Sequence, residues 1–99
     1  MYRVTRTYIR GDESAEFYVI SRLTSETISW MASQPGFMNH TYTYSSDNLT
    51  LTRIIEFTSQ ETFENMVSLW LANNPEYNSE FETYNAANGH VAANNAEEV

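Results

Sequence analysis

Four side chains in the middle of the chain are of types that could carry chemistry: His40, Tyr42, Arg53 and Trp70. His40 could exchange a proton near neutral pH, because the unperturbed pKa of imidazole is about 6.5. Arg53 is a permanent cation whose planar set of donors matches an organic anion. Tyr42 and Trp70 could supply ring faces together with a hydroxyl or N–H group. We therefore treat these four residues as the candidate pocket.

The same residues also have ordinary structural interpretations. Arg53 could be a buried cation compensated by a carboxylate, and His40 could be partly exposed and hydrogen-bonded to backbone. Trp70 lies in the centre of an apolar helical stripe, where core packing is the usual role of an aromatic side chain. Four tyrosines could line either an aromatic pocket or a protein interface, namely Tyr42, Tyr44, Tyr77 and Tyr84.

The composition excludes several classes of function. The chain has 99 residues, enough for one domain with a single core. Its 13 acidic residues outnumber five basic residues, all of them arginine, and a net charge of −8 would repel nucleic acid and anionic lipid. The absence of cysteine removes disulfides, thiolate nucleophiles and cysteine-based zinc sites. We therefore expect no nucleic-acid partner.

No sequence motif indicates a metal or cofactor site. The two histidines cannot by themselves form a conventional metal centre. The carboxylate pairs Glu76/Glu80 and Glu97/Glu98 lack the oxygen count and the loop of a calcium site, which favours a solvated acidic surface. Phosphate-binding loops, nucleophile elbows and zincin motifs are absent as well. The sequence therefore predicts no metal and no cofactor.

Targeting and membrane segments are not recognisable either. Residues 1–6 alternate in polarity and do not form a signal peptide. The longest apolar run, Phe17–Ile20, is far shorter than the roughly 20 residues of a spanning helix. We expect a cytoplasmic protein without a membrane partner.

Three strands are predicted from a two-residue alternation of side chains. They cover residues 2–10, 37–44 and 49–57, and the last two are separated by turn residues typical of a hairpin. Within this hairpin, His40 and Arg53 are polar residues on an otherwise apolar face. They lie within about one cross-strand step of each other.

Helices are predicted between and after these strands. Residues 24–34 form one, ended by Pro35 and the glycine that follows. Another begins after Ser59 and extends through Leu71, and a third follows Pro75 as far as residue 88. Residues 11–23 are left open between a helix and a short strand or extended arm.

The end of the chain is predicted to be a mobile acidic tail. Residues 90–99 carry little apolar periodicity, and only one β-branched residue lies at 90–93. We therefore predict a single α+β domain over residues 1–89 and place His90 in the tail. On this interpretation the sheet lacks a good candidate for a fourth strand.

Three short motifs resemble those of a known family. They are Pro35-Gly36-Phe37 at a helix-to-strand joint, the aromatic strand end at Phe57, and Ser59-Gln60-Glu61-Thr62-Phe63 at the start of a helix. Over residues 24–71 the chain resembles the antibiotic-biosynthesis-monooxygenase-like members of the dimeric α+β barrel superfamily. Residues 84–89 are also similar to the ends of small uncharacterised proteins of marine bacteriophages.

The first resemblance implies a ferredoxin-like antiparallel sheet covered by helices, and a homodimer whose sheets pack face to face. It also implies oxidation of a small phenolic or polycyclic aromatic substrate by molecular oxygen, without metal or flavin. In such a pocket Arg53 would face the substrate anion and His40 would act as a base. The alternative hypothesis is a non-enzymatic phage-type protein whose aromatic surface makes protein–protein contacts.

Overall fold

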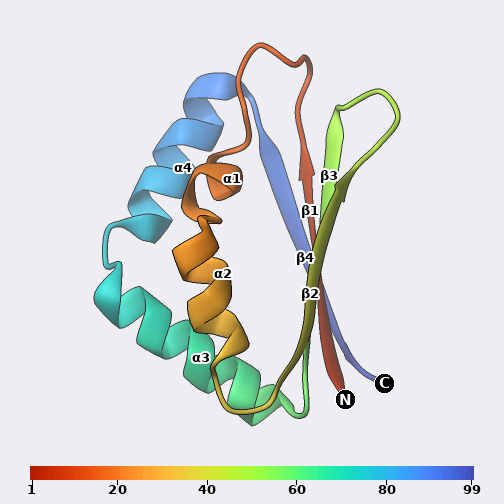
Figure 1. The fold of residues 1–99 in the computed structure, drawn as a ribbon. Coiled ribbons are helices and arrows are strands. Elements are labelled where there is room, and N and C mark those ends of the chain that lie inside the picture. The colour runs from red at the N-terminus through yellow and green to blue at the C-terminus, as the bar shows by residue number, and fades with distance from the viewer.

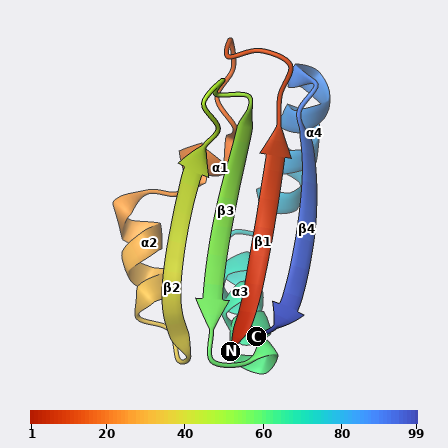
Figure 2. The ribbon, with the colours of Figure 1, turned by 90° about the vertical axis from the view of Figure 1, so that its right-hand side faces the viewer.

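Four antiparallel strands form one sheet in the order β2-β3-β1-β4, and four helices cover one of its faces (Figure 1). The computed structural model describes all 99 residues. Its elements are β1 (Tyr2–Ile9), α1 (Tyr18–Arg22), α2 (Ser25–Ala32), β2 (Phe37–Tyr44), β3 (Thr50–Phe57), α3 (Gln60–Asn73), α4 (Tyr77–Asn88) and β4 (Val91–Glu98). Figure 2 shows the opposite face of the sheet, which no helix covers. The predicted ferredoxin-like α+β fold is confirmed.

Alternation along the central strands separates a helix-facing side from an open side. In β3, Leu51, Arg53, Ile55 and Phe57 are buried beneath the helices, and the residues between them point the other way. The neighbouring strand β1 runs antiparallel to β3 without a register shift. Its helix-facing side chains therefore lie directly opposite those of β3, which fixes what the sheet presents to the helices.

Two of the sequence motifs meet where α2 joins β2. The Ser59 hydroxyl accepts a hydrogen bond from the Thr62 N–H at 3.2 Å, and the Thr62 hydroxyl accepts one from the Ser59 N–H at 3.3 Å. This capping box starts α3. Gly36 packs against it with a φ of +83°, and the Gly36 carbonyl accepts from the Thr58 N–H at 2.8 Å. The motifs thus position α3 against the sheet.

The segment that the sequence left open contains a loop and one short helix. Residues 11–17 lead from the end of β1 to the helix layer, and Phe17 is buried before α1 begins. An extended approach and a short helix are therefore both present, in that order. Across the whole molecule, no helix combines the length and the apolarity needed to cross a bilayer.

The structure corrects the prediction of a mobile tail at residues 90–99. Residues 91–98 form β4, which pairs with β1 from Ile9 opposite Val91 to Tyr2 opposite Glu98. Alanine, asparagine and glutamate have low strand propensity, but the free edge of β1 offers a complete set of backbone partners, and this pairing outweighs propensity. Gly89 reverses the chain in the left-handed conformation at the end of α4.

His90 also departs from its predicted place in a tail. It is only 8% exposed, because it follows the end of α4 and packs beneath the segment that leads to α1. Its ring centroid lies 5.0 Å from that of Phe17 and 5.8 Å from that of Tyr84. His90 is therefore a packing residue.

Candidate functional site

The buried core is divided into two clusters by a pair of arginines. One cluster contains Val4, Met31, Ile55, Phe57, Phe63 and Met66, and the other contains Tyr8, Phe17, Val19 and Leu51. On β1 and β3 the positions between the clusters are Arg6 and Arg53, which are direct partners in the strand register. The apolar alternation of both strands is thus interrupted at the same level of the sheet.

A cavity of about 320 Å³ lies over this interruption, between the sheet and the helices. Thirteen of its 19 lining residues are hydrophobic. Arg6, Tyr8 and Arg53 line it from the sheet, and Trp70 and Tyr77 line it from the helices. Its volume is at the lower end of the range for small-molecule sites. No aspartate, glutamate or histidine is among the lining residues.

Arg53 is held by His40. The Arg53 Nε–H donates to His40 Nε2 at 2.8 Å, so His40 acts as a neutral acceptor with its proton on Nδ1. Burial, together with the positive charge of Arg53, lowers the pKa of His40 to about 4. Arg53 itself is 7% exposed, and burial together with the charge of Arg6 lowers its pKa. It remains charged near neutral pH, because the normal arginine pKa exceeds 12.

Arg6 has no hydrogen-bond partner for its Nε atom, which is buried. Its guanidinium carbon lies 5.9 Å from the centre of the Phe63 ring, a distance consistent with a cation–π contact. It belongs to no ion pair. The sheet side of the cavity therefore carries two positive charges and no negative one.

Arg22 lines the helix side of the cavity and is fully compensated. Its guanidinium donates to Glu76 and to Asn74 at 2.8 Å each, and it lies 3.7 Å from Glu80. The pair Glu76/Glu80 therefore partners an arginine, and both carboxylates are also exposed to solvent, as the sequence predicted. Nowhere in the 99 residues do three or more His, Cys, Asp or Glu side chains gather in a way that could hold a metal ion.

Aromatic rings form the helix-side wall. The rings of Trp70 and Tyr77 meet edge to face with centroids 4.7 Å apart, and Arg22 lies 5.3 Å from the Trp70 ring. Tyr77 also stacks on Phe81 at 5.7 Å. Burial raises the pKa of Tyr77 to about 12, so its hydroxyl stays protonated at neutral pH and can donate a hydrogen bond.

The structure brings together three of the four candidate residues, in different roles. Arg53 and Trp70 line the cavity. His40 is hydrogen-bonded to Arg53 but does not itself line the cavity. Tyr42 is 40% exposed on β2, opposite Arg53 in the register, with its ring 6.1 Å from that of His40. It too lies outside the cavity lining.

Sequence reasoning missed Arg6 as a site residue. The signal was present, because Arg6 alternates with Val4 and Tyr8 on the apolar side of a strand. What the pattern could not supply was the register of β1 against β3, which places Arg6 beside Arg53. Tyr77 was considered for an aromatic pocket, and it does line the cavity.

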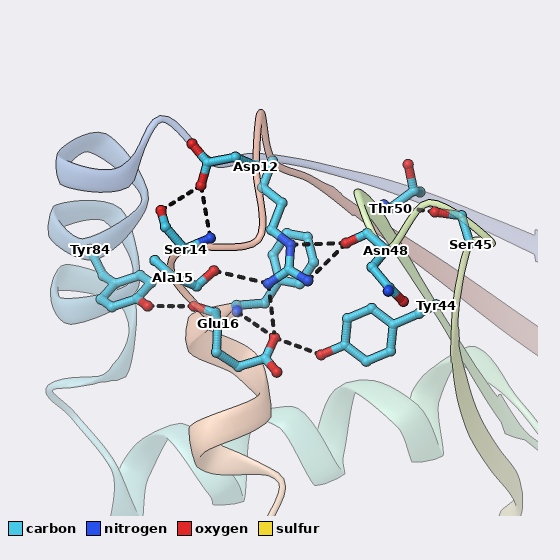
Figure 3. A network of polar contacts seen from close by, with 11 residues as sticks. Asp12, Ser14, Ala15, Glu16, Tyr44, Ser45, Asn48, Thr50 and Tyr84 are labelled. Carbon is cyan, nitrogen blue, oxygen red and sulfur yellow. Dashed lines mark hydrogen bonds and ion pairs between the residues drawn. The ribbon is translucent and has the colours of Figure 1, made fainter.

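A polar network fastens the segment that leads to α1 (Figure 3). Arg10 donates to the Asn48 carbonyl at 2.8 Å and to the Ala15 carbonyl at 2.9 Å, and its guanidinium also contacts Glu16. The hydroxyl of Tyr44 donates to the Glu16 carboxylate at 2.6 Å, and that of Tyr84 donates to the Glu16 carbonyl.

Glu16 is the centre of this network. Burial alone would raise the pKa of Glu16, but hydrogen bonds from Tyr44 and from the Phe17 N–H, with the charge of Arg10, outweigh it and lower the pKa. The carboxylate therefore stays ionised and fastens the segment before α1. Tyr44 and its partners are structural residues, and they fix Val19 and Leu23 in the cavity wall.

Solved structures of oxygenases have the same fold. SnoaB from Streptomyces nogalater, a cofactor-independent oxygenase, matches 99% of this chain and 91% of its own with a TM-score of 0.59 and 17% identity. A mutant of SnoaB gives a TM-score of 0.61 at the same identity and coverage. A monooxygenase from the gene ActVA-Orf6 of Streptomyces coelicolor, solved with the ligand nanaomycin D, matches 99% of this chain and 88% of its own with a TM-score of 0.60 and 14% identity.

Comparisons of the sequence, by contrast, found no match. No protein-family model matches the chain, and no curated protein matches it. The similarity to phage proteins stays a prediction, whereas the resemblance to antibiotic-biosynthesis-monooxygenase-like proteins is confirmed for the fold. With four antiparallel strands and helices on one face, the chain has the ferredoxin-like α+β fold of these cofactor-independent oxygenases.

Proposed function

We propose that this protein binds a small aromatic molecule in the cavity and oxidises it with molecular oxygen, as a cofactor-independent monooxygenase. The observation that carries the proposal is the composition of the cavity walls. Rings of Trp70 and Tyr77 face two uncompensated arginines, and no carboxylate lies between them. Apolar walls with a few convergent polar groups are typical of small-molecule sites. The shared fold with oxygenases is consistent with this function.

The arginines provide the chemistry expected of such a pocket. Positive charge beside a phenol lowers the pKa of its hydroxyl, because it favours the phenolate over the neutral form. A phenolate is electron-rich at its para carbon and can donate two electrons to oxygen as a carbon–oxygen bond forms. Loss of the para hydrogen and cleavage of the oxygen–oxygen bond then release water. The balance is one phenol and one O₂ giving one para-quinone and one water.

The site residues follow from this scheme. Arg53 and Arg6 stabilise the substrate anion, and Trp70 and Tyr77 hold its ring. His40 is a positioning residue, because its Nε2 is occupied by the Arg53 Nε–H and its pKa of about 4 makes it a weak base. The sequence assigned the role of base to His40, and the geometry favours proton release to water. Tyr42 lies too far toward the surface for a direct role.

We also propose that two copies pack through the uncovered face of the sheet. Side chains on that face alternate with the buried ones and are rich in threonine, with Thr5 and Thr7 on β1 and Thr52 and Ile54 on β3. Open sheet faces of β-branched residues pack well against a second sheet. The cavity lies on the opposite side of the sheet, so this association would leave it accessible.

Oxygen uptake tests the proposed function. Quinols and hydroxylated fused-ring aromatics would be screened with an oxygen electrode, and product mass after reaction under ¹⁸O₂ would show whether one labelled atom is incorporated. We expect uptake that Trp70→Ala reduces at least about tenfold, since an aromatic contact of about 1.5 kcal/mol is lost.

The matched control is Leu69→Ala, on the outer face of the same helix, where Leu69 is 52% exposed. That variant should react like the unmodified protein. If no compound in the panel supports uptake above the rate without protein, the enzymatic proposal is wrong, and the interaction-protein alternative becomes the working hypothesis.

A further inference from the structure

The arginines differ in whether a carboxylate compensates them. Arg3 pairs with Glu56 at 2.9 Å, Arg10 with Glu16 at 3.4 Å, and Arg22 with Glu76 at 2.8 Å. Arg6 and Arg53 have no acidic partner. The chain carries 13 acidic residues and only five basic ones, so carboxylates are plentiful. Their absence from this one pair is therefore a specific property of the cavity.

The two unpaired arginines are also the two that face each other. Arg6 and Arg53 are cross-strand partners in the centre of the sheet, and both line the cavity. Cross-strand neighbours of like charge destabilise a sheet, and buried charges without partners cost further free energy. The Nε–H of Arg6 is buried without an acceptor, and Arg53 has neutral partners, His40 and the hydroxyl of Tyr8, in place of a carboxylate. The two guanidinium groups therefore have no negatively charged partner within the chain.

Apolar walls beside the arginines limit what that anion can be. Trp70, Val67, Leu71 and Met66 line the same cavity. An inorganic anion would satisfy the guanidinium groups and leave this apolar surface in contact with water. A molecule with a carboxylate at one end and rings at the other satisfies both parts of the site.

Deepening the proposed function, on which this inference rests, we propose that the ligand is a hydroxylated aromatic carboxylic acid whose carboxylate lies between Arg6 and Arg53. A neutral phenol would leave two charges uncompensated until its proton is lost. A carboxylate neutralises one of them on binding, and the second remains to stabilise the neighbouring ring oxyanion. A hydroxyl group ortho to the carboxylate places both anionic groups at the arginine pair.

Calorimetric titration of the full chain at pH 7, without oxygen, tests this assignment. The probes are 1-hydroxy-2-naphthoate and 1-naphthol, which share the ring and hydroxyl and differ in the carboxylate, with inorganic phosphate as a competitor. On the unmodified protein we expect the acid to bind at least about tenfold more tightly than the naphthol, since a hydrogen bond to a charged group exceeds that difference.

Two substitutions on β1 provide the matched pair. Arg6→Gln removes a charge from the cavity, and Arg3→Gln removes the same charge from the other face of the strand. Arg6→Gln should weaken the acid at least about tenfold and 1-naphthol by a clearly smaller factor, and Arg3→Gln should alter neither affinity. Arg6→Gln should fold, because its side chain makes no hydrogen bond and its removal relieves repulsion from Arg53.

The inference is overturned if the acid and the naphthol bind equally, if Arg6→Gln binds the acid as tightly as the unmodified protein, or if phosphate displaces the acid at equal concentration. The first and third comparisons use the unmodified protein and hold whether or not the variants fold. Binding is measured separately from turnover. Arg6-dependent binding of the acid without oxygen uptake would support the inference and count against the monooxygenase proposal. Oxygen uptake with a neutral phenol, and not with the acid, would support the monooxygenase proposal and count against the inference.

Discussion

Replacement of Gly36 by alanine should be the most damaging of the three glycine-to-alanine changes in the chain. A Cβ at this position would lie 2.5 Å from the Thr62 hydroxyl oxygen and 2.7 Å from that of Thr58. The backbone φ of +83° adds the strain of a left-handed conformation, roughly 1 to 2 kcal/mol. Displacement of Thr62 from the capping box adds about 1 kcal/mol. The expected loss of unfolding free energy is therefore roughly 2 to 3 kcal/mol.

The other two glycines are internal controls. Gly89 has a φ of +66° with no atom within 4 Å of a new Cβ, so Gly89→Ala should cost only the strain, about 1 kcal/mol. Gly11 also has open space and no positive φ, and Gly11→Ala should change stability by less than about 1 kcal/mol.

Urea unfolding followed by circular dichroism measures all three variants. With a slope of about 1 kcal/mol per M, Gly36→Ala should lower the midpoint by roughly 2 to 3 M. Thr62→Ala should cost less in the Gly36→Ala background than alone, because it removes one of the colliding groups. Equal midpoints for Gly36→Ala and Gly89→Ala would refute the steric argument and the contact between the two sequence motifs.

Three further outcomes are expected. The pKa of His40 is about 4 in the folded protein and about 6.5 when unfolded, so its contribution to the free energy of unfolding is complete above pH 6.5 and decreases by at most about 2 kcal/mol between pH 7 and 5. His40→Gln should therefore reduce the pH dependence of the free energy of unfolding, measured in urea, over this interval. An unchanged pH profile would contradict the buried neutral imidazole. Tyr44→Phe should lower the free energy of unfolding, measured in urea, by about 1 kcal/mol, because its hydrogen bond to Glu16 is charge-assisted but the carboxylate is 54% exposed. An unchanged free energy of unfolding would mean that water replaces this hydrogen bond. Ile54→Arg on the uncovered sheet face should halve the mass measured by light scattering while the circular dichroism spectrum is kept, and a monomeric unmodified protein would refute the proposed association.

Local sequence patterns predicted correctly those features that depend on residues close together in the chain. Alternation in the hairpin predicted that His40 and Arg53 share a face, and their nitrogen atoms are 2.8 Å apart. The capping residues around Ser59 predicted the start of α3 to within a residue. In these places, short-range sequence preferences and the tertiary structure agree.

Long-range pairing accounts for what sequence reasoning missed. Strand β4 has poor strand formers and forms because the edge of β1 is free to pair. The role of Arg6 depends on its register against β3, which no local pattern encodes. The acceptor role of His40 likewise depends on which atom of Arg53 it meets. Such features arise only when the sheet is assembled.

The central claim is that the cavity between the two core clusters is a binding site for an aromatic anion. A crystal structure of the protein with 1-hydroxy-2-naphthoate tests it most directly. The account predicts the carboxylate within hydrogen-bond distance of Arg6 and Arg53 and the rings against Trp70. A ligand bound elsewhere, or a cavity closed by Trp70 and Tyr77 with Arg6 paired to a carboxylate of the protein, would contradict it.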